Sequence, residues 1–253
     1  MDLFNLKGKV ALVTGTTRGI GAAAAIGLAE AGASLCLVQR PGSTNLDTFN
    51  KIKALGNTVH VVDCDLSDMD AVKTLFDRAL EAMGGEIHIL VNCAGIQRRA
   101  PAVDFPEQDW DDVISVNLKS CWLLSQSAGR HMVPLKRGKI INFCSLLTFQ
   151  GGFTVPAYAS SKGALGQLTK ALSNEWSAEN VQVNGIVPGY INTDMNANLL
   201  SNPTRLRQIS ERIPAGRWGE PDDFKGPVVF LASKASDYVC GELVVVDGGW
   251  MGR

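Results

Sequence analysis

The sequence lacks long hydrophobic runs and a charge excess of either sign. In its 253 residues no apolar stretch reaches the roughly 20 residues that a bilayer-spanning helix needs. Lys and Arg number 24 and Asp and Glu 25, which gives a net charge of −1. Nucleic-acid-binding proteins usually carry a basic excess that neutralises phosphates. We therefore expect neither a membrane protein nor a nucleic-acid-binding protein.

Cysteine and histidine patterns that would hold a metal ion are also missing. None of the six cysteines belongs to a C-x-x-C pair or stands at zinc-ligand spacing, and the three histidines are far apart. An acidic residue follows Met1 and no signal-peptide pattern is present. We expect no metal site, and we expect reduced cysteines in a cytoplasmic protein.

The sequence does contain a regular alternation of short apolar runs and longer helical segments. Seven continuous runs rich in Val, Ile and Leu are typical of strands buried on both faces. They cover residues 10–13, 34–38, 58–62, 87–91, 139–143, 181–187 and 243–246. Expected helices cover residues 20–31, 46–55, 67–83, 109–132 and 157–177.

This alternation predicts an α/β fold with a doubly wound, Rossmann-like parallel sheet of seven strands and helices on both faces. The length fits one dinucleotide-binding domain over residues 1–253. Polar residues, prolines and a glycine at 193–220 interrupt the rhythm, so we expect a substrate lid inserted there.

A glycine-rich turn follows the first expected strand. Gly15, Gly19 and Gly21 have the spacing G-x-x-x-G-x-G between a strand and a helix. Such a turn lets the backbone approach a pyrophosphate at a helix N-terminus. Glycines that serve packing alone are the alternative. We interpret the turn as a nucleotide site and expect Gly15, Thr17, Arg18, Gly19 and Ile20 to contact the cofactor.

The ends of the next two strands bear on the choice of cofactor. An acidic residue after the second strand would bind a ribose 2′-hydroxyl, whereas an arginine accommodates a 2′-phosphate. Here Gln39 is neutral and Arg40 follows it, with Arg18 nearby. NADP is therefore favoured over NAD, although both arginines could be solvated surface charges. Asp65, after the third strand, is expected to contact the adenine, or else to serve only as a helix-entry residue.

A tyrosine and a lysine stand four residues apart at the start of a long expected helix. Tyr158 and Lys162 therefore share one helix face, and an ammonium beside a phenol favours the phenolate. The pair can act as a general acid/base on an alcohol or carbonyl oxygen. Ser145, at a strand end, can donate a second hydrogen bond to that oxygen. A lone Tyr-x-x-x-Lys usually consists of two surface residues with no catalytic role, so the prediction depends on the other motifs in the sequence.

Taken together, the motifs resemble the short-chain dehydrogenase/reductase family over nearly the whole chain. Thr14–Gly21 matches its TGxxxGxG turn, and Asn92–Gly95 matches its NNAG motif with Cys93 in place of the second Asn. The remaining matches are the catalytic tetrad Asn117, Ser145, Tyr158 and Lys162, the nicotinamide segment Pro188, Gly189 and Thr193, and the C-terminal Asp247-Gly248-Gly249.

The resemblance implies an NAD(P)-dependent dehydrogenase or reductase acting on a secondary alcohol or ketone. Tyr158 would exchange the proton, Lys162 would assist it and hold the nicotinamide ribose, and Ser145 would orient the carbonyl. Asn117 would anchor a water that relays protons. The family usually forms homodimers or homotetramers. Further implied cofactor contacts are Leu66, Asn92, Ala94, Gly95, Tyr158, Lys162, Pro188, Gly189, Ile191 and Thr193.

Several stretches are similar to one subgroup, the 2-deoxy-D-gluconate 3-dehydrogenases. They cover residues 94–99, 109–114, 149–152, 213–219 and 248–250. This similarity implies a sugar-acid substrate and a place in carbohydrate metabolism, and arginines suit a carboxylate. It also points towards NAD, against the evidence of Arg40. The expected substrate contacts are Gln97, Arg98, Leu147, Gln150, Tyr158 and Met195.

Three alternatives remain at this point. Arg98 and Arg99 could serve an oligomer surface instead of a substrate. Apolar side chains near the expected pocket, Leu146, Leu147, Phe153 and Met195, would suit an NADPH-dependent reductase of a hydrophobic or secondary-metabolite ketone. A nucleotide-binding regulator could use the same fold. Because Ser145, Tyr158 and Lys162 are all present, we favour the enzyme.

Overall fold

The computed structural model describes residues 2–253 and confirms the predicted seven-stranded parallel sheet. The strand order is β3-β2-β1-β4-β5-β6-β7. Strands β1 to β3 are added towards one edge of the sheet and β4 to β7 towards the other, so the order of addition reverses between β1 and β4. Ligands of doubly wound sheets bind at such a switch point. The strands are β1 (Val10–Thr14), β2 (Ser34–Gln39), β3 (Val59–Asp63), β4 (Ile89–Asn92), β5 (Gly138–Phe143), β6 (Val181–Pro188) and β7 (Leu243–Val246).

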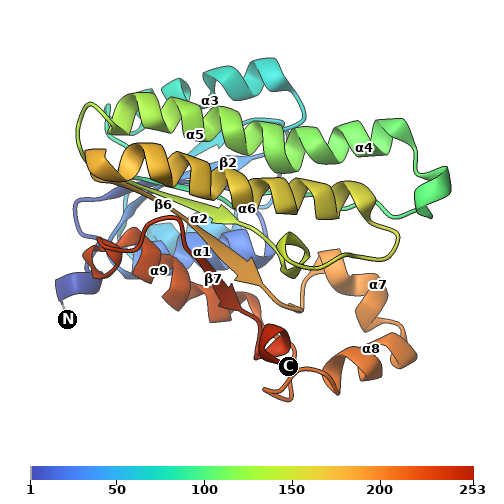
Figure 1. The fold of residues 1–253 in the computed structure, drawn as a ribbon. Coiled ribbons are helices and arrows are strands. Elements are labelled where there is room, and N and C mark those ends of the chain that lie inside the picture. Colours follow the sequence, from blue (N-terminus) through green and yellow to red (C-terminus); the bar gives the residue numbers. More distant parts are fainter. Residues whose placement is uncertain (1) are drawn as a thin grey trace.

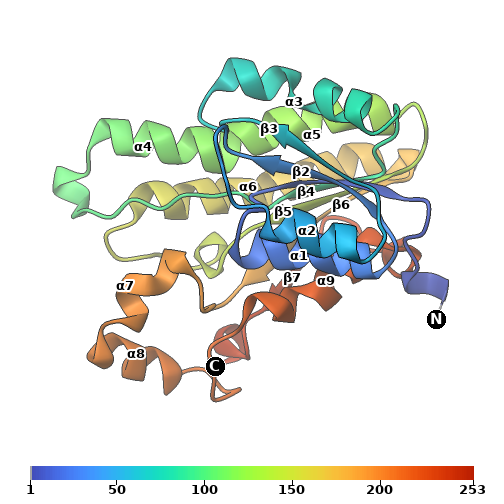
Figure 2. The same ribbon diagram turned by 180° about the vertical axis from the view of Figure 1, so that it is seen from behind.

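Helices cover both faces of this sheet (Figures 1 and 2). One face carries α1 (Gly19–Glu30), α2 (Asp47–Ala54) and α9 (Lys225–Ala232). The other carries α3 (Met69–Ala82), α4 (Glu107–Ile114), α5 (Ser120–Met132) and α6 (Pro156–Trp176). The short helical turns are η1 (Asp2–Phe4), η2 (Ala102–Asp104), η3 (Ser115–Lys119), η4 (Leu146–Thr148), η5 (Ser177–Glu179), η6 (Asp194–Asn196), η7 (Pro221–Phe224), η8 (Lys234–Ser236) and η9 (Trp250–Gly252).

Two helical features differ from the sequence expectation. The expected helix at 109–132 is divided into α4 and α5 by η3, a five-residue π-helical turn. Such turns frequently mark functional sites. Helix α9 was not predicted, because its apolar residues are continuous and show no helical period.

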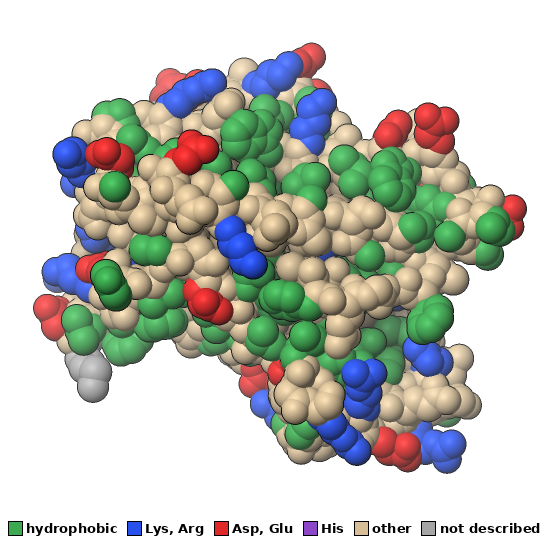
Figure 3. All heavy atoms as spheres, in the orientation of Figure 1, with side chains coloured by type: hydrophobic (Ala, Val, Ile, Leu, Met, Phe, Trp, Pro, Cys, Tyr) green, Lys and Arg blue, Asp and Glu red, His purple; other side chains and the backbone are tan. Residues whose placement is uncertain are grey.

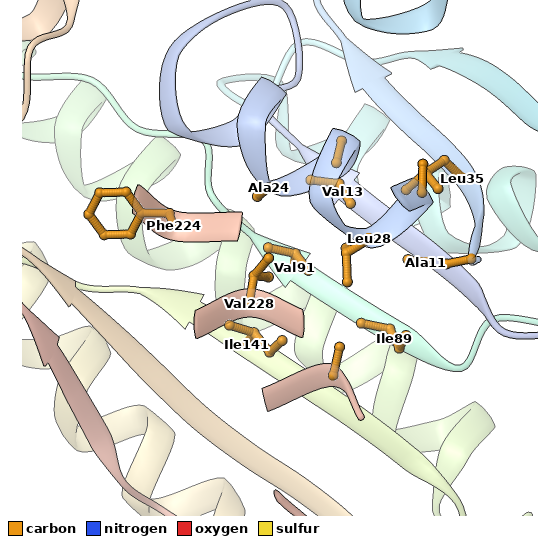
Figure 4. Close-up of a cluster of buried hydrophobic side chains, with 14 of the residues drawn as sticks. Ala11, Val13, Ala24, Leu28, Leu35, Ile89, Val91, Ile141, Phe224 and Val228 are labelled. Atoms are coloured by element: carbon orange, nitrogen blue, oxygen red, sulfur yellow. The ribbon is translucent and has the colours of Figure 1, made fainter. Parts of the chain in front are cut away.

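Close packing between α1 and α9 builds the core on one face of the sheet (Figure 4). Ala24 and Leu28 of α1 and Val228 of α9 are fully buried in one apolar cluster. A Cβ at Gly27 would lie 2.9 Å from the Cβ of Lys225, so only glycine permits this approach. The contact fixes the helix that follows the glycine-rich turn.

The helix that carries Tyr158 and Lys162 is held equally firmly on the opposite face. A Cβ at Gly129 of α5 would lie 2.7 Å from the ring of Trp176, the last residue of α6. The glycine therefore lets this end of α6 pack directly against α5. Asn142 of β5 donates from Nδ2 to Thr169 Oγ1 of α6 at 2.9 Å, with both residues fully buried. These contacts fix α6 relative to the strand ends.

Segment 193–220 forms η6, α7 (Ala197–Leu200) and α8 (Pro203–Ser210), which lie beyond the carboxyl ends of the strands (Figure 1). Within residues 2–253, no helix has both the length and the apolar character to cross a membrane. The same residues contain no group of three or more His, Cys, Asp or Glu side chains placed to hold a metal ion.

Candidate active site

A cleft of about 1720 Å³ lies at the carboxyl ends of the strands and runs from the glycine-rich turn to the C-terminal η9. It brings together nearly all the residues that the sequence proposed for the site. Those that line it are Gly15, Thr17, Arg18, Gly19, Ile20, Arg40, Asp65, Leu66, Ala94, Gly95, Gln97, Arg98, Ser145, Leu147, Gln150, Tyr158, Lys162, Pro188, Gly189, Ile191, Thr193 and Met195. Asn92 and Asn117 lie outside the lining.

The glycine-rich turn packs directly on the loop after β4. Gly15 has φ +74°, and a Cβ there would lie 2.9 Å from the Cα of Ala94. The hydroxyl of Thr14 accepts hydrogen bonds from the backbone N–H groups of Cys93 (3.0 Å) and Ala94 (3.1 Å). A Cβ at Gly21 would collide with the carbonyl oxygen of Gly15. The turn is therefore a close-fitting backbone cradle at the N-terminus of α1, as a pyrophosphate site requires.

Beyond β2 and β3 the cleft offers polar groups suited to an adenosine. Gln39 is 3% exposed, and its Nε2 has no partner among residues 2–253. The next residue, Arg40, is exposed. The Asp65 carboxylate accepts from Ser67 N at 2.9 Å and Ser67 Oγ at 2.7 Å. These hydrogen bonds hold the pKa of Asp65 below its usual value, so this carboxylate remains an acceptor at neutral pH.

Lys162 and Tyr158 meet inside the cleft. Lys162 is 4% exposed, and its Nζ donates to the carbonyl oxygen of Phe143 at 2.7 Å. The same ammonium lies 5.7 Å from the centroid of the Tyr158 ring, and Tyr158 is 9% exposed. A buried ammonium is thus held beside a phenol that faces the cleft.

Ser145 is tied to the same helix through a short turn. Its Oγ accepts from Leu147 N at 3.2 Å, and its backbone N–H donates to Thr148 Oγ1 at 3.3 Å. The Thr148 hydroxyl in turn donates to the carbonyl oxygen of Lys162 at 3.0 Å. This chain of bonds couples the position of Ser145 to that of the lysine.

Asn117 occupies the π-helical turn η3 and is fully buried. Its Oδ1 accepts from Ile96 N at 2.8 Å, and its Nδ2 donates to Ile96 O at 2.9 Å and to Ser161 Oγ at 3.3 Å. The position of Gly95 lies between the two groups: a Cβ there would be 3.4 Å from Asn117 Oδ1 and 3.8 Å from Lys162 Nζ. Asn117 thus joins the loop after β4 to α6, close to the lysine.

Asn92 lies beneath the cleft, not in it. It is 2% exposed, and its Nδ2 donates to Ser125 Oγ at 3.2 Å and to Asn142 Oδ1 at 2.9 Å. Because these partners belong to α5 and β5, Asn92 supports the sheet below the cofactor end of the cleft.

Arg98, expected on the substrate side, has an acidic neighbour. Its Nε lies 3.3 Å from Asp109 Oδ1, so part of its charge is already balanced. Gln150 Oε1 accepts from the indole Nε1 of Trp250 at 3.3 Å. No site role for Trp250 was predicted from the sequence.

The segment around α8 supplies further lining residues that were not predicted from the sequence. Their sequence positions have the i, i+3, i+4 and i+7 spacing of one helical face, although the last of them lies just beyond the end of α8: Arg205, Gln208, Ile209 and Arg212. This spacing is a signal that could have been found. The colour of basic side chains is prominent on the surface over α8, whose basic residues are all arginines (Figure 3).

Comparison with known proteins agrees with this arrangement. The family model described as Enoyl-(Acyl carrier protein) reductase, a short-chain dehydrogenase/reductase model, matches residues 15–251. The chain belongs to the short-chain dehydrogenase/reductase family. The expected family and fold are both confirmed.

Relatives within this family are similar along their whole length. A 2-dehydro-3-deoxy-D-gluconate 5-dehydrogenase of Pseudoalteromonas atlantica is 53% identical, with 100% of both chains covered. One from Bacillus subtilis is 48% identical, covering 100% of this chain and 98% of the relative. The crystal structure of a gluconate 5-dehydrogenase from Burkholderia cenocepacia in complex with NADP and tartrate has a TM-score of 0.94 at 39% identity. It covers 100% of this chain and 98% of that one.

Proposed function

We propose that this protein is an NADP-dependent oxidoreductase that interconverts a secondary alcohol and a ketone of a sugar acid, with 2-dehydro-3-deoxy-D-gluconate as its substrate. The observation that carries the proposal is the Lys162 ammonium beside Tyr158, in the same cleft as the glycine-rich turn. Relatives of high identity support the choice of substrate, since four at 45% to 53% identity are named 2-dehydro-3-deoxy-D-gluconate 5-dehydrogenase.

The cofactor end of the cleft fits NADP. Gly15 and Gly21 let the turn pack closely on Ala94 and on its own backbone at the N-terminus of α1, and Gln39 presents a buried nitrogen without a partner among residues 2–253. Arg40 would bind the 2′-phosphate and Asp65 the adenine amino group. The solved relative with NADP bound supports this choice over NAD. When bound, NADP accepts the hydride from the substrate carbon, or NADPH supplies it in reverse.

The proton follows a path through the side chains beside the nicotinamide site. In oxidation, Tyr158 Oη accepts the proton of the substrate hydroxyl, and in reduction it returns that proton to the carbonyl oxygen. The ammonium of Lys162, held by the Phe143 carbonyl, stabilises the phenolate. Ser145 donates a hydrogen bond that orients the substrate oxygen. Asn117 positions a water that carries the proton between Lys162 and the solvent.

The remaining site residues are assigned by the part of the cleft that they line. Thr17, Arg18, Gly19 and Ile20 surround the pyrophosphate, and Leu66, Ala94 and Gly95 border the adenosine and ribose. Pro188, Gly189, Ile191 and Thr193 border the nicotinamide. Gln97, Gln150, Leu147 and Met195 contact the substrate, beneath a lid formed by residues 193–220. Asn92, which bonds to Asn142 beneath the cleft, would support the sheet under the cofactor.

A substrate panel assayed with both cofactors tests the proposal. The panel contains 2-dehydro-3-deoxy-D-gluconate, D-gluconate, the neutral polyol D-glucitol and a hydrophobic ketone. We expect the highest kcat/KM for a sugar acid with the NADP couple, and a kcat at least about 1,000-fold lower for Tyr158→Phe. Preference for the hydrophobic ketone, or no turnover of any sugar acid, would overturn the proposal.

We further propose a cytoplasmic homotetramer. All six cysteines lack disulfide partners, which fits a reducing compartment. Trp110 of α4 and Trp122 of α5 are 39% and 37% exposed, which favours these helices as an interface. Light scattering on the purified protein should give four times the mass of one chain, and a single-chain mass would refute the assembly.

A further inference from the structure

Six arginines line the cleft, and two of them have uncommitted side chains. Among residues 2–253, the guanidinium groups of Arg40 and Arg212 have neither an ion-pair partner nor a hydrogen-bond acceptor. The others are paired: Arg18 with Asp194, Arg98 with Asp109, Arg99 with Gln97 and Arg205 with Gln208. Arg40 follows β2, near one edge of the sheet, while Arg212 lies at the other end of the cleft, against the turn after β7. Within the described residues, the cleft therefore offers one free cation at each end.

Arg212 is held by an aromatic platform. Its guanidinium carbon lies 3.9 Å from the centroid of the Trp250 ring, within the range of a cation–π contact. Trp250 is 5% exposed and its Nε1 donates to Gln150 Oε1 at 3.3 Å, so the ring is fixed. Stacking orients a guanidinium by its face and leaves the N–H groups at its edge free for an acceptor.

The backbone around Arg212 is also fixed. Ile209 and Ile213, on either side of it, are 3% and 4% exposed in the same apolar cluster as Trp250. Two residues further on, Ala215 N donates to Gly248 O at 2.9 Å. Arg212 is therefore anchored on both sides, although it belongs to the lid segment, and its position is prepared before a ligand binds.

We propose that Arg212, oriented by Trp250, binds the substrate carboxylate and determines the preference for a sugar acid. This inference rests on the proposed function and assigns the acid-recognising residue within it. A planar guanidinium with free N–H groups can bind a carboxylate with two parallel hydrogen bonds. Arg98, the residue expected from the sequence, is less suited because Asp109 already balances its charge. Each of the two free arginines thus binds one anion: Arg40 binds the 2′-phosphate of the cofactor, and Arg212 binds the carboxylate of the substrate.

The test compares an acid with its neutral counterpart. Arg212→Met keeps an apolar stem on Trp250 and removes the charge. For 2-dehydro-3-deoxy-D-gluconate we expect KM to rise about 10- to 100-fold, as the removal of one charge-assisted hydrogen-bonded pair implies. For the methyl ester of the same acid, KM should change less than about threefold, because the ester has no charge for Arg212 to bind. Equal effects on acid and ester, or no effect on either, would overturn the inference.

Matched variants separate charge from geometry. Arg212→Lys keeps the charge without the planar fork, so its KM for the acid should fall between those of wild type and Arg212→Met. Arg207→Met, on helix α8 just before Arg212, removes an arginine that pairs with Glu211 and does not line the cleft. It should behave like wild type. An equal KM rise in Arg207→Met would mean that the net charge of the lid is responsible, and would overturn the assignment.

A binding measurement keeps this inference distinguishable from the proposed function. Calorimetric titration of the NADP-loaded protein with tartrate needs no turnover. Wild type and Arg207→Met should bind tartrate, and Arg212→Met should bind it about 10- to 100-fold more weakly. No binding by wild type, or equal binding by all three proteins, would refute the role of Arg212. Absence of sugar-acid turnover by wild type would instead refute the proposed function.

Discussion

Replacement of Gly15 by alanine perturbs the point where the glycine-rich turn meets the loop after β4. At φ +74° an L side chain costs about 1–2 kcal/mol. The added Cβ would also lie 2.9 Å from the Cα and 3.0 Å from the N of Ala94. Both atoms are backbone, so the loop itself must move, and with it the hydrogen bonds that Cys93 and Ala94 donate to Thr14.

A matched glycine allows these two costs to be separated. Overpacking of this kind costs about 1–3 kcal/mol, so Gly15→Ala should lower the free energy of unfolding by about 2–5 kcal/mol in total. Gly8→Ala is the matched control, because Gly8 has φ +77° and no atom within 4 Å of an added Cβ. It should lose only the conformational part, about 1–2 kcal/mol.

Urea unfolding measures the stability part, and fluorescence titration with NADPH measures the binding part. Displacing backbone N–H groups from a phosphate should raise the Kd of Gly15→Ala about tenfold or more. Gly8→Ala should bind NADPH like wild type, since Gly8 does not line the cleft. The reasoning is refuted if Gly15→Ala loses no more stability than Gly8→Ala, or if it binds NADPH as tightly as wild type.

Three further predictions address the catalytic, cofactor and thiol groups. Tyr158→Phe should lower kcat at least about 1,000-fold while the Kd for NADPH stays within about twofold, because only the proton-transferring hydroxyl is removed; retained turnover would exclude the acid/base role. Arg40→Ala should raise the Kd for NADPH about 10- to 100-fold and that for NADH less than about threefold, and equal weakening would refute the 2′-phosphate contact. Burial raises the pKa of the Cys36 thiol to about 12, so a thiol reagent at pH 8 should label exposed Cys240 first and fully buried Cys36 only after unfolding, as mass spectrometry of the labelled peptides would show.

The sheet could be predicted because its strands are buried on both faces. Strands β1 and β4 are almost wholly buried, so their sequences are nearly continuous apolar runs whatever packs on them. The expected strand bounds are all within two residues of those observed. Helix α9 escaped prediction for the same reason, since its apolar residues also form an unbroken run that no period marks as helical. The π-helical turn η3 has no signal of its own in the spacing of apolar residues.

By itself, the sequence determined the fold class, the family and the candidate groups for the chemistry. Those features depend on local spacing: three glycines in one turn, and a tyrosine and lysine one helical turn apart. The tertiary structure alone decided which charges are free. Asp109 balances Arg98, whereas Trp250, 38 residues along the chain, stacks under Arg212 without balancing its charge. Whether an arginine meets an acid or an aromatic ring depends on how distant segments pack.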